Sequence, residues 1–519
     1  RGDCDTEVLL RAYIEYGVNC VDHLRGMFAF VVWDRRHQTL HVFRDRLGIK
    51  PFYICRYGES VILSSEIKSI LAYSPKLGKF NQKTIFKYLA RGWVDNSNAT
   101  FYEDISAVEP ASVVSFSNRG IQKKIYWQLN PTSQRRFEPD EFLNCFKETI
   151  SLHLRSDVPL ATTLSGGMDS SSITAVASQQ RDSREKLHAF SVIPPQTLDE
   201  SPWIDLTVKS TGIKHSYLDL EIPCMSTLFD EVLGIHDEPF QSSSCLYQYL
   251  LRRQVGELGI KVLLVGEGGD EVLGGYRRLF YPFLYSLRQD KRKIEFEKAL
   301  HGGKDFLGKD TSTILRGVEK YEELIQSGQS GQENTTAYEI LSDEYCNEHR
   351  EIIEAPAYPS SANSIGNYFF AHLYQHLFSM DIPYVLRMED RNSMAHGVES
   401  RVPFLDHQFV EHAFSYDYAA FMQGGSNKNM LRQAMHQVLH PEILHRKDKS
   451  PRPGSNTHVV YGDLRTRISG YLESASFRES SIWKDDCPEL FNQDCMTQNS
   501  ERAEMWFRLL SYCSLTQAS

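Results

Sequence analysis

The sequence predicts an α/β protein made of two units, a strand-rich N-terminal unit and a doubly wound parallel sheet extended by C-terminal helices. Up to about residue 130, short apolar runs are separated by turns, which is typical of β-hairpins. From about residue 138, apolar strands alternate with helical stretches, as in a parallel sheet covered by helices. We therefore place the units at 1–130 and 138–519, joined by a polar linker with two prolines at 130–139.

The N-terminal unit is predicted to begin with a helix at 8–16, which has Val8, Leu9 and Ala12 on its apolar face. Paired strands should follow, because apolar or alternating runs flank short polar turns. The predicted strands, in chain order, are 28–33, 39–43, 52–57, 61–64, 113–116 and 121–126.

In the second unit, strands are predicted at 158–164, 187–193 and 260–265, and a helix at 170–178. The first and third strands end in the two densest polar motifs of the chain. Ligands of such sheets bind at the carboxyl ends of the strands, so these motifs should share one site. Farther along, 302–309 and 327–331 are predicted as surface loops within a helical section.

The composition is that of a globular protein, with 519 residues and a net charge of -10. No long basic run is present, so nucleic acid is not an expected partner. The 10 cysteines are scattered without a Cys-x-x-Cys pair, which favours a reducing cytoplasm over a zinc site or a disulfide framework. No apolar run reaches transmembrane length, so no membrane association is expected.

The first motif is Leu-Ser-Gly-Gly-Met-Asp-Ser-Ser at 164–171, between a predicted strand and a predicted helix. The glycine pair lets backbone N–H groups approach an anion, and the helix N-terminus adds partial positive charge. An anion-binding loop would otherwise avoid the carboxylate of Asp169, which a divalent cation bridging to phosphate oxygens explains. The loop lacks the Gly-Lys-Ser/Thr of a Walker loop. It therefore predicts a different type of pyrophosphate and magnesium site.

The second motif, Val-Gly-Glu-Gly-Gly-Asp-Glu at 265–271, again follows an apolar strand, and Gly-Gly-Tyr comes soon after at 274–276. Glycines around three carboxylates suit a ligand loop better than a core. Alone, the motif is also compatible with a solvated turn that has helix-capping acids. At the end of a second strand of the same sheet, it predicts that Asp169 and Asp270 share one magnesium ion.

Two further motifs are charged. At 387–394 and 399–406, charges alternate with apolar residues, which indicates partly buried ion pairs. We interpret Glu399, Arg401 and Asp406 as mainly structural, and consider Glu389 and Asp390 as candidates to face a substrate. The basic, proline-containing stretch 446–453 is either a solvated surface or a loop that closes over polyphosphate.

Together these motifs resemble the glutamine-dependent asparagine synthetase family. The first loop is similar to the pyrophosphate loop of N-type ATP pyrophosphatases, and the segments 265–271, 401–406 and 446–453 match the rest of the synthetase part. The segments 2–7, 24–30 and 44–51 resemble the later part of a glutamine amidotransferase domain of the N-terminal-nucleophile type. The resemblance implies an incomplete αββα amidotransferase domain followed by an ATP pyrophosphatase domain.

The resemblance also implies roles for individual residues. The implied ATP-binding residues are Leu164, Ser165, Gly166, Gly167, Asp169, Ser170, Val192, Val265 and Gly266. The implied magnesium ligands are Asp169 and Asp270. Glu267 matches a glutamate of the adenylation and amide-forming site, Lys449 a lysine on the phosphate side, and Asp3 the aspartate that binds the amino group of glutamine.

The chain departs from the family pattern in two places. The family's cysteine nucleophile would lie upstream of Arg1, and Cys4 is internal without a free amine, so we expect no glutamine hydrolysis. Asp448 resembles a one-residue insertion, which leaves Lys447 and Lys449 both open as the functional lysine.

The chemistry implied is a ligase reaction with ATP and Mg²⁺ as cofactors. A carboxylate, in the family the side chain of aspartate, attacks the α-phosphate and releases pyrophosphate. Ammonia then attacks the acyl-adenylate, and Glu267 or Glu389 could accept the proton. Ammonia comes from glutamine in intact family members, and a homodimer is the candidate assembly. Two alternatives stay open: a related lactam-forming amide ligase, which tends to have tyrosine in place of Glu267, and a non-catalytic nucleotide-binding relative.

Overall fold

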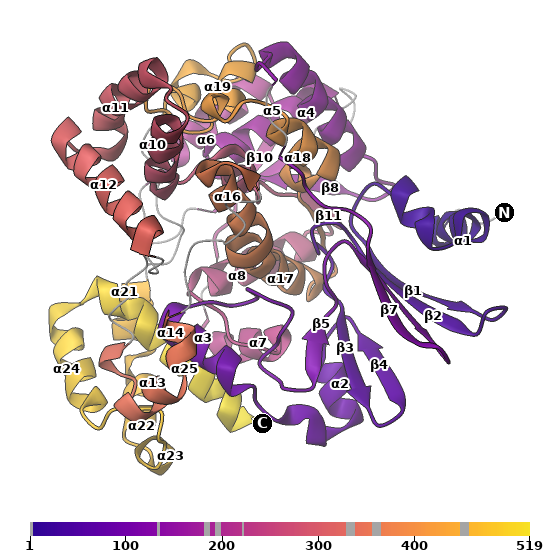
Figure 1. Ribbon diagram of the computed structural model, residues 1–519, viewed down its shortest axis with the longest axis vertical. Coiled ribbons are helices and arrows are strands. Elements are labelled where there is room, and N and C mark those ends of the chain that lie inside the picture. Colours follow the sequence, from indigo (N-terminus) through magenta and orange to yellow (C-terminus); the bar gives the residue numbers. More distant parts are fainter. Residues whose placement is uncertain are drawn as a thin grey trace.

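The protein folds as two units, followed by a large set of C-terminal helices (Figure 1). The structure, a computed structural model, describes residues 4–131, 135–180, 187–192, 199–220, 223–327, 338–354, 365–446 and 456–518. The α/β class predicted from the sequence is confirmed.

The N-terminal unit contains two antiparallel sheets. The four-stranded sheet has the order β1-β2-β6-β7, and the three-stranded sheet has the order β4-β3-β5. The strands are β1 (Ala29–Asp34), β2 (Thr39–Arg44), β3 (Tyr53–Tyr57), β4 (Ser60–Ser64), β5 (Ile105–Ala107), β6 (Ser112–Ser117) and β7 (Gly120–Ile125). The helices are α1 (Asp5–Tyr16), α2 (Ile67–Tyr73) and α3 (Gln82–Arg91).

Three clusters of apolar side chains hold these layers in the order helix, sheet, sheet, helix. Phe43 and Val113 pack with residues of α1 on the outer face of the first sheet. Val42 and Phe52 fill the space between the two sheets. Tyr53 of β3 belongs to the core that contains α2 and α3. Because apolar residues alternate along β2 and β3, each strand contributes to the layers on both of its sides. This is the αββα arrangement.

The second unit is built on a five-stranded parallel sheet with the order β10-β9-β8-β11-β12. Its strands are β8 (Leu160–Thr163), β9 (His188–Ser191), β10 (Lys214–Tyr217), β11 (Val262–Leu264) and β12 (Glu399–Arg401). The strand order grows outward from β8 in both directions, so the sheet is doubly wound and its topological switch point lies between β8 and β11. The central strands β8 and β11 are largely buried on both faces, which explains the continuous apolar run of β11.

Helices cover this sheet and extend beyond it. Those around the sheet include α4 (Pro139–His153), α5 (Met168–Gln180), α6 (Ser201–Thr211), α7 (Met225–His236), α8 (Ser244–Glu257) and α17 (Asp381–Met394). Further along are α9 (Gly269–Leu273), α10 (Phe280–Gln289), α11 (Lys293–Leu307), α12 (Thr311–Ser327), α16 (Tyr368–Gln375), α18 (His407–Phe414) and α19 (Asn429–Ala434). The helices near the C-terminus, drawn in yellow in Figure 1, include α22 (Arg465–Leu472), α24 (Cys487–Thr497) and α25 (Ser500–Ala518). No helix in the described part of the chain is long and apolar enough to cross a membrane.

The prediction of a surface loop at 302–309 is wrong, because most of it is the last turns of α11. The glycines that suggested a loop instead allow close packing. A Cβ atom on Gly303 would lie 2.6 Å from Cε1 of Phe280, and one on Gly302 would lie 1.9 Å from the carbonyl oxygen of Gly424. In the other predicted loop, Ser327 ends α12 and 328–331 lie outside the described residues.

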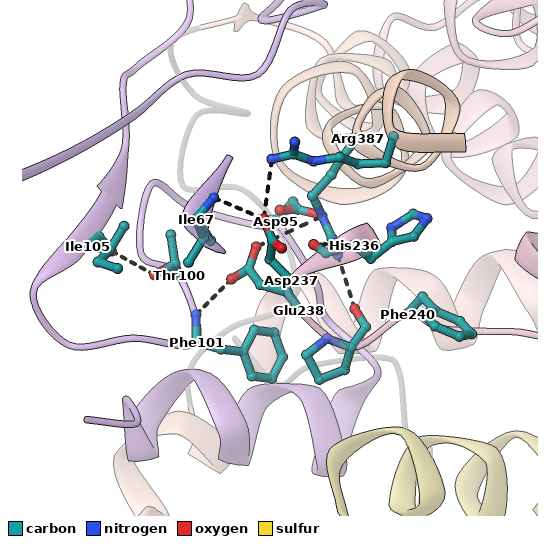
Figure 2. Close-up of polar contacts among 12 residues, drawn as sticks. Ile67, Asp95, Thr100, Phe101, Ile105, His236, Asp237, Glu238, Phe240 and Arg387 are labelled. Atoms are coloured by element: carbon teal, nitrogen blue, oxygen red, sulfur yellow. Dashed lines mark hydrogen bonds and ion pairs between the residues drawn. The ribbon is translucent and has the colours of Figure 1, made fainter. Parts of the chain in front are cut away.

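A buried charged cluster joins the two units (Figure 2). Arg387 of α17 places its Nε 2.8 Å from Oδ2 of Asp95, which follows α3, and 4.0 Å from Oε2 of Glu238. Glu238 accepts a hydrogen bond over 2.8 Å from the backbone N–H of Phe101. Asp237 accepts hydrogen bonds from the N–H groups of the first turn of α2, at 2.9 Å from Ile67. The second unit thus caps a helix of the first.

Replacing Glu238 with glutamine is expected to change how stability depends on pH. Burial raises the pKa of Glu238 from 4.5 to about 7, against the opposing effect of Arg387 and with a further increase from Asp95. The folded state therefore binds the proton more firmly than the unfolded state, and this stabilisation is lost as pH rises from about 5 to 8. Glutamine retains an acceptor for Phe101 and does not ionise.

Relative to the natural chain, Glu238→Gln should gain about 1–3 kcal/mol between pH 5 and 8. Urea unfolding of both proteins across this range measures the difference. Two stability curves that stay parallel would contradict the assignment of this raised pKa to Glu238.

Candidate active site

Two polar loops emerge side by side at the switch point of the parallel sheet. Thr162 of β8 lies opposite Leu264 of β11, so the two strands end at the same edge. Leu164 continues from β8, Val192 from the neighbouring β9, and Val265 from β11. Residues that lie far apart in the sequence are thereby brought to the edge where doubly wound sheets bind ligands.

The first loop, 164–167, is closed by its serines. The backbone N–H of Ser165 donates to Oγ of Ser170 over 3.1 Å, and the two hydroxyl oxygens lie 3.0 Å apart. Ser170 Oγ also donates to the carbonyl of Gly167 over 3.2 Å. Helix α5 begins at Met168, so its first N–H groups lie beside this loop. Such an arrangement favours an anion, in agreement with the predicted pyrophosphate loop.

Gly166 packs the first loop tightly against α6. Its φ is 70°, and a Cβ atom there would lie 3.1 Å from Cβ of Trp203. Arg446 donates to the carbonyl of Gly166 over 3.0 Å, contacts Glu200 over 2.8 Å and lies 3.8 Å from the centre of the Trp203 ring. The first residue of the basic stretch 446–453 therefore lies against the first loop. The sequence pattern did not decide between this arrangement and a solvated surface.

The second loop, 265–268, is pressed against the first. The Val265 N–H donates to the carbonyl of Arg401 over 3.0 Å, which extends the β11–β12 pairing. A Cβ atom on Gly266 would lie 3.3 Å from the backbone nitrogen of Ser170, and one on Gly269 would lie 2.7 Å from Cγ of Asp169. Because these glycines have no side chain, the second loop lies closer to Asp169 than it could with any other residue at these two positions.

Asp169 and Asp270 meet at the ammonium group of Lys428. Lys428 Nζ lies 2.5 Å from Oδ2 of Asp169 and 2.8 Å from Oδ1 of Asp270. Lys428 is not among the site residues predicted from the sequence. Lys428 directly precedes the short helix α19, and no motif around it in the sequence marks it.

The two carboxylates fit a magnesium ion that is bound together with a nucleotide. Oδ1 of Asp169 is buried and has no hydrogen-bond partner. The described residues contain no group of three or more His, Cys, Asp or Glu side chains that could hold a metal. Mg²⁺ is usually held by one or two carboxylates, with water and substrate phosphates completing the octahedron. Asp169 and Asp270 match this donor set, and a complete protein cage is not needed.

Glu267 lies in the second loop, between Gly266 and Gly268, and is partly exposed. Gly268 has a φ of 89°, and a Cβ atom there would lie 2.5 Å from the side chain of Leu405. Because Gly268 packs against Leu405 on one side, the loop is fixed just after the carboxylate of Glu267. Glu267 thus shares a short, fixed loop with the residues that contact Asp169.

Glu389 does not lie in either loop but in a buried polar cluster on α17. Its two oxygens each lie 2.8 Å from the guanidinium of Arg252, and Gln248 donates to Oε2 over 2.7 Å. The hydroxyl of Ser400 also donates to Oε1. Every Glu389 oxygen therefore accepts at least two hydrogen bonds within this cluster.

The other charged residues of this region also have structural contacts. Asp390 contacts Lys50 over 2.9 Å. Arg401 donates to the carbonyls of His153 and Arg155, and Asp406 caps α18. Glu399 contacts Arg401 over 2.7 Å, so all three residues interpreted as mainly structural make contacts of that kind. Asp3, Lys447 and Lys449 lie outside the described residues.

Replacing Glu389 with alanine should destabilise the fold by about 3–5 kcal/mol, because the buried charge of Arg252 loses its partner. The double variant Arg252→Met, Glu389→Met removes both charges and should regain a large part of that loss. Urea unfolding of the two variants and the natural chain measures both effects. Equal destabilisation by the single and double variants would contradict the assignment of this ion pair as a coupled structural unit.

Sequence comparisons identify relatives over nearly the whole chain. The family model described as asparagine synthase matches residues 141–516, and that of a glutamine amidotransferase domain matches residues 1–127. Asparagine synthetase [glutamine-hydrolyzing] 3 of Bacillus subtilis is 27% identical over 497 residues, covering 92% of this chain and 74% of that protein. A putative asparagine synthetase 2 of Methanocaldococcus jannaschii is 34% identical over 279 residues, covering 52% and 54%. Amidase chry2 of Gibberella zeae is 24% identical, covering 95% and 79%.

Proposed function

This chain belongs to the asparagine synthase family, and we propose that it joins aspartate and ammonia to form asparagine with cleavage of ATP to AMP and pyrophosphate. The observation that carries the proposal is the meeting of Asp169 and Asp270 at one cation, beside a loop that suits an anion. A pyrophosphate leaving group and a magnesium ion need both features at one place.

We assign the binding of ATP to the three strand ends. Leu164, Val192 and Val265 would line the nucleotide, and the loop of Ser165, Gly167 and Ser170 would hold its phosphates with backbone N–H groups and hydroxyls. Asp169 and Asp270 would hold Mg²⁺, which when bound neutralises charge on the phosphate oxygens. Arg446 keeps the first loop against α6, so the N–H groups stay oriented while charge develops.

Glu267 is our candidate for the proton acceptor when ammonia attacks the acyl-adenylate. It lies on the loop that contacts Asp169, whereas Glu389 lies in a buried cluster with Arg252, Gln248 and Ser400. Glu267→Gln should lower asparagine formation by about 10²–10⁴-fold, the usual contribution of a general base. Glu399→Gln is the matched control, because Glu399 contacts Arg401 in a partly exposed pair and should retain near-natural activity.

We propose ammonia as the nitrogen source used by residues 1–519. On the phosphate side we propose a lysine of the segment 447–449. Comparing Lys447→Met with Lys449→Met decides which one acts.

The direct test is a product analysis of the purified chain with ATP, Mg²⁺, aspartate and ammonium. The proposal predicts equal amounts of AMP, pyrophosphate and asparagine. Pyrophosphate release with another carboxylate but not with aspartate would instead indicate a related amide ligase. Nucleotide binding without any turnover would indicate a non-catalytic relative.

A further inference from the structure

We propose that Lys428 is a placeholder for the magnesium ion, so that its ammonium group must leave the aspartate pair before the metal binds. The inference rests on the proposed magnesium and ATP chemistry, and it concerns how the chain controls access to that site. It makes metal binding depend on the nucleotide that arrives with it.

The contacts of Lys428 show why the two cations compete. Its Nζ lies 2.5 Å from Oδ2 of Asp169 and 2.8 Å from Oδ1 of Asp270, and these oxygens belong to both proposed metal ligands. Mg²⁺ requires ligand oxygens at about 2.0–2.1 Å in a nearly ideal octahedron. An ion held by both carboxylates would therefore lie at or directly against the position of the ammonium group.

The surroundings leave little space for both cations together. A Cβ atom on Gly275 would lie 1.8 Å from Oδ1 of Asp270 and 2.4 Å from Cε of Lys428, so the backbone of Gly275 already contacts both side chains. Lys428 is only 4% exposed. Placing Mg²⁺ beside the ammonium in this enclosed site would also bring like charges together with little screening by water.

The charges of the site favour replacement of the Lys428 ammonium group by Mg²⁺ over binding of Mg²⁺ beside it. The two carboxylates carry two negative charges, and the ammonium compensates one of them. Without any cation, the carboxylates would repel each other in a largely buried place. The ammonium therefore stabilises the protein before the metal arrives and lowers its affinity for Mg²⁺ alone. Nucleotide phosphates add negative charge beside the site and so favour the entry of the divalent ion.

The backbone of Lys428 is fixed, so the exchange requires only its side chain to move. Lys428 has a φ of 50° and directly precedes α19. Its neighbour Asn427 donates to the carbonyl of Gly275 over 2.5 Å, and Arg432 donates to the carbonyl of Asn427 over 2.8 Å. The flexible four-carbon stem of a lysine can then move its charge away without rearranging the loop.

The test measures divalent-metal binding by the full chain in the absence of nucleotide. Mn²⁺, which suits the same oxygen ligands, is titrated into the protein while free Mn²⁺ is followed by electron paramagnetic resonance. Lys428→Met removes the charge and retains a similar length. It should raise the affinity for Mn²⁺ by roughly tenfold or more, whereas Lys428→Arg should stay close to the natural chain.

Lys50→Met is the matched control. Lys50 forms a partly buried pair with Asp390 at 2.9 Å, at the interface between the two units. Its replacement also leaves a carboxylate without its lysine, but Mn²⁺ affinity should not change. If Lys428→Met does not fold, Lys428→Gln removes the same charge with a polar side chain and carries the same expectation.

Equal Mn²⁺ affinity of a folded, charge-removing variant and the natural chain would overturn the inference, as would tight Mn²⁺ binding by the natural chain without nucleotide. Measuring aspartate-dependent exchange of pyrophosphate into ATP on the natural chain separates this failure from that of the proposed function. If the natural chain exchanges pyrophosphate into ATP but Lys428→Met does not change the Mn²⁺ affinity, only the placeholder role is overturned. If Lys428→Met raises the Mn²⁺ affinity but the natural chain does not exchange pyrophosphate into ATP, the placeholder role is supported and the proposed reaction is contradicted.

Discussion

Replacing Asp169 with asparagine should reduce aspartate-dependent pyrophosphate release by at least about 10³-fold, because it removes one of two carboxylates that would hold the metal. Asparagine is similar in size and remains a neighbour for Gly266 and Gly269, which pack against this side chain. The loss should therefore come from the missing charge and not from a cavity. Steady-state release of pyrophosphate, measured at saturating ATP and magnesium, gives the effect.

Asp205→Asn is the control for this substitution. Asp205 is an aspartate of α6 that accepts a hydrogen bond from Tyr217 at the surface, so its variant should retain natural activity. Near-natural activity of Asp169→Asn would show that the metal is held elsewhere, and the assignment of Asp169 and Asp270 would fail.

Replacing Gly275 with alanine should reduce the same activity by about 10²-fold or more, because displacements near 1 Å of reacting groups have effects of this size. The added Cβ would lie 1.8 Å from Oδ1 of Asp270, which no carboxylate can tolerate without moving. Asp270 would then leave its position opposite Asp169. Pyrophosphate release, with circular dichroism to verify folding, measures the effect.

Gly470→Ala is the control for Gly275→Ala, because it makes the same substitution where the added methyl group has space. Gly470 lies within α22, and a Cβ atom there meets nothing within 4 Å. Alanine should stabilise this helix by about 0.5–1 kcal/mol and leave activity unchanged. An active Gly275→Ala variant would contradict the close approach that the structure gives for Gly275 and Asp270.

The sequence predicted the sheets well where apolar periodicity was strong and poorly where other contacts decide the structure. The hairpins of the N-terminal unit and strands β8, β9 and β11 follow from their apolar runs. Strand β12, with the sequence Glu-Ser-Arg, has no apolar run and forms because its backbone pairs with β11. Gly302 and Gly303 suggested a loop because the sequence does not show that Phe280 packs against that helix.

In the site, the sequence predicted that the two glycine-rich loops lie together, because both follow strands of one parallel sheet. It did not reveal Lys428, which lies far along the chain before a short helix and has no motif around it. It indicated buried ion pairs near Glu389, but it did not show that Arg252 and Ser400 are the partners of this carboxylate. Charged residues interleaved with apolar ones occur both in structural ion pairs and in catalytic sites, so the sequence pattern does not separate the two.

The central claim is that the paired loops form a site in which the aspartate side chain attacks the α-phosphate of ATP. The most direct measurement uses aspartate whose side-chain carboxylate carries a heavy oxygen isotope, with mass spectrometry of the nucleotide and phosphate products after asparagine has formed. The account predicts that labelled oxygen appears in AMP and that pyrophosphate stays unlabelled. Labelled inorganic phosphate accompanied by ADP would show attack at the γ-phosphate and would contradict the account.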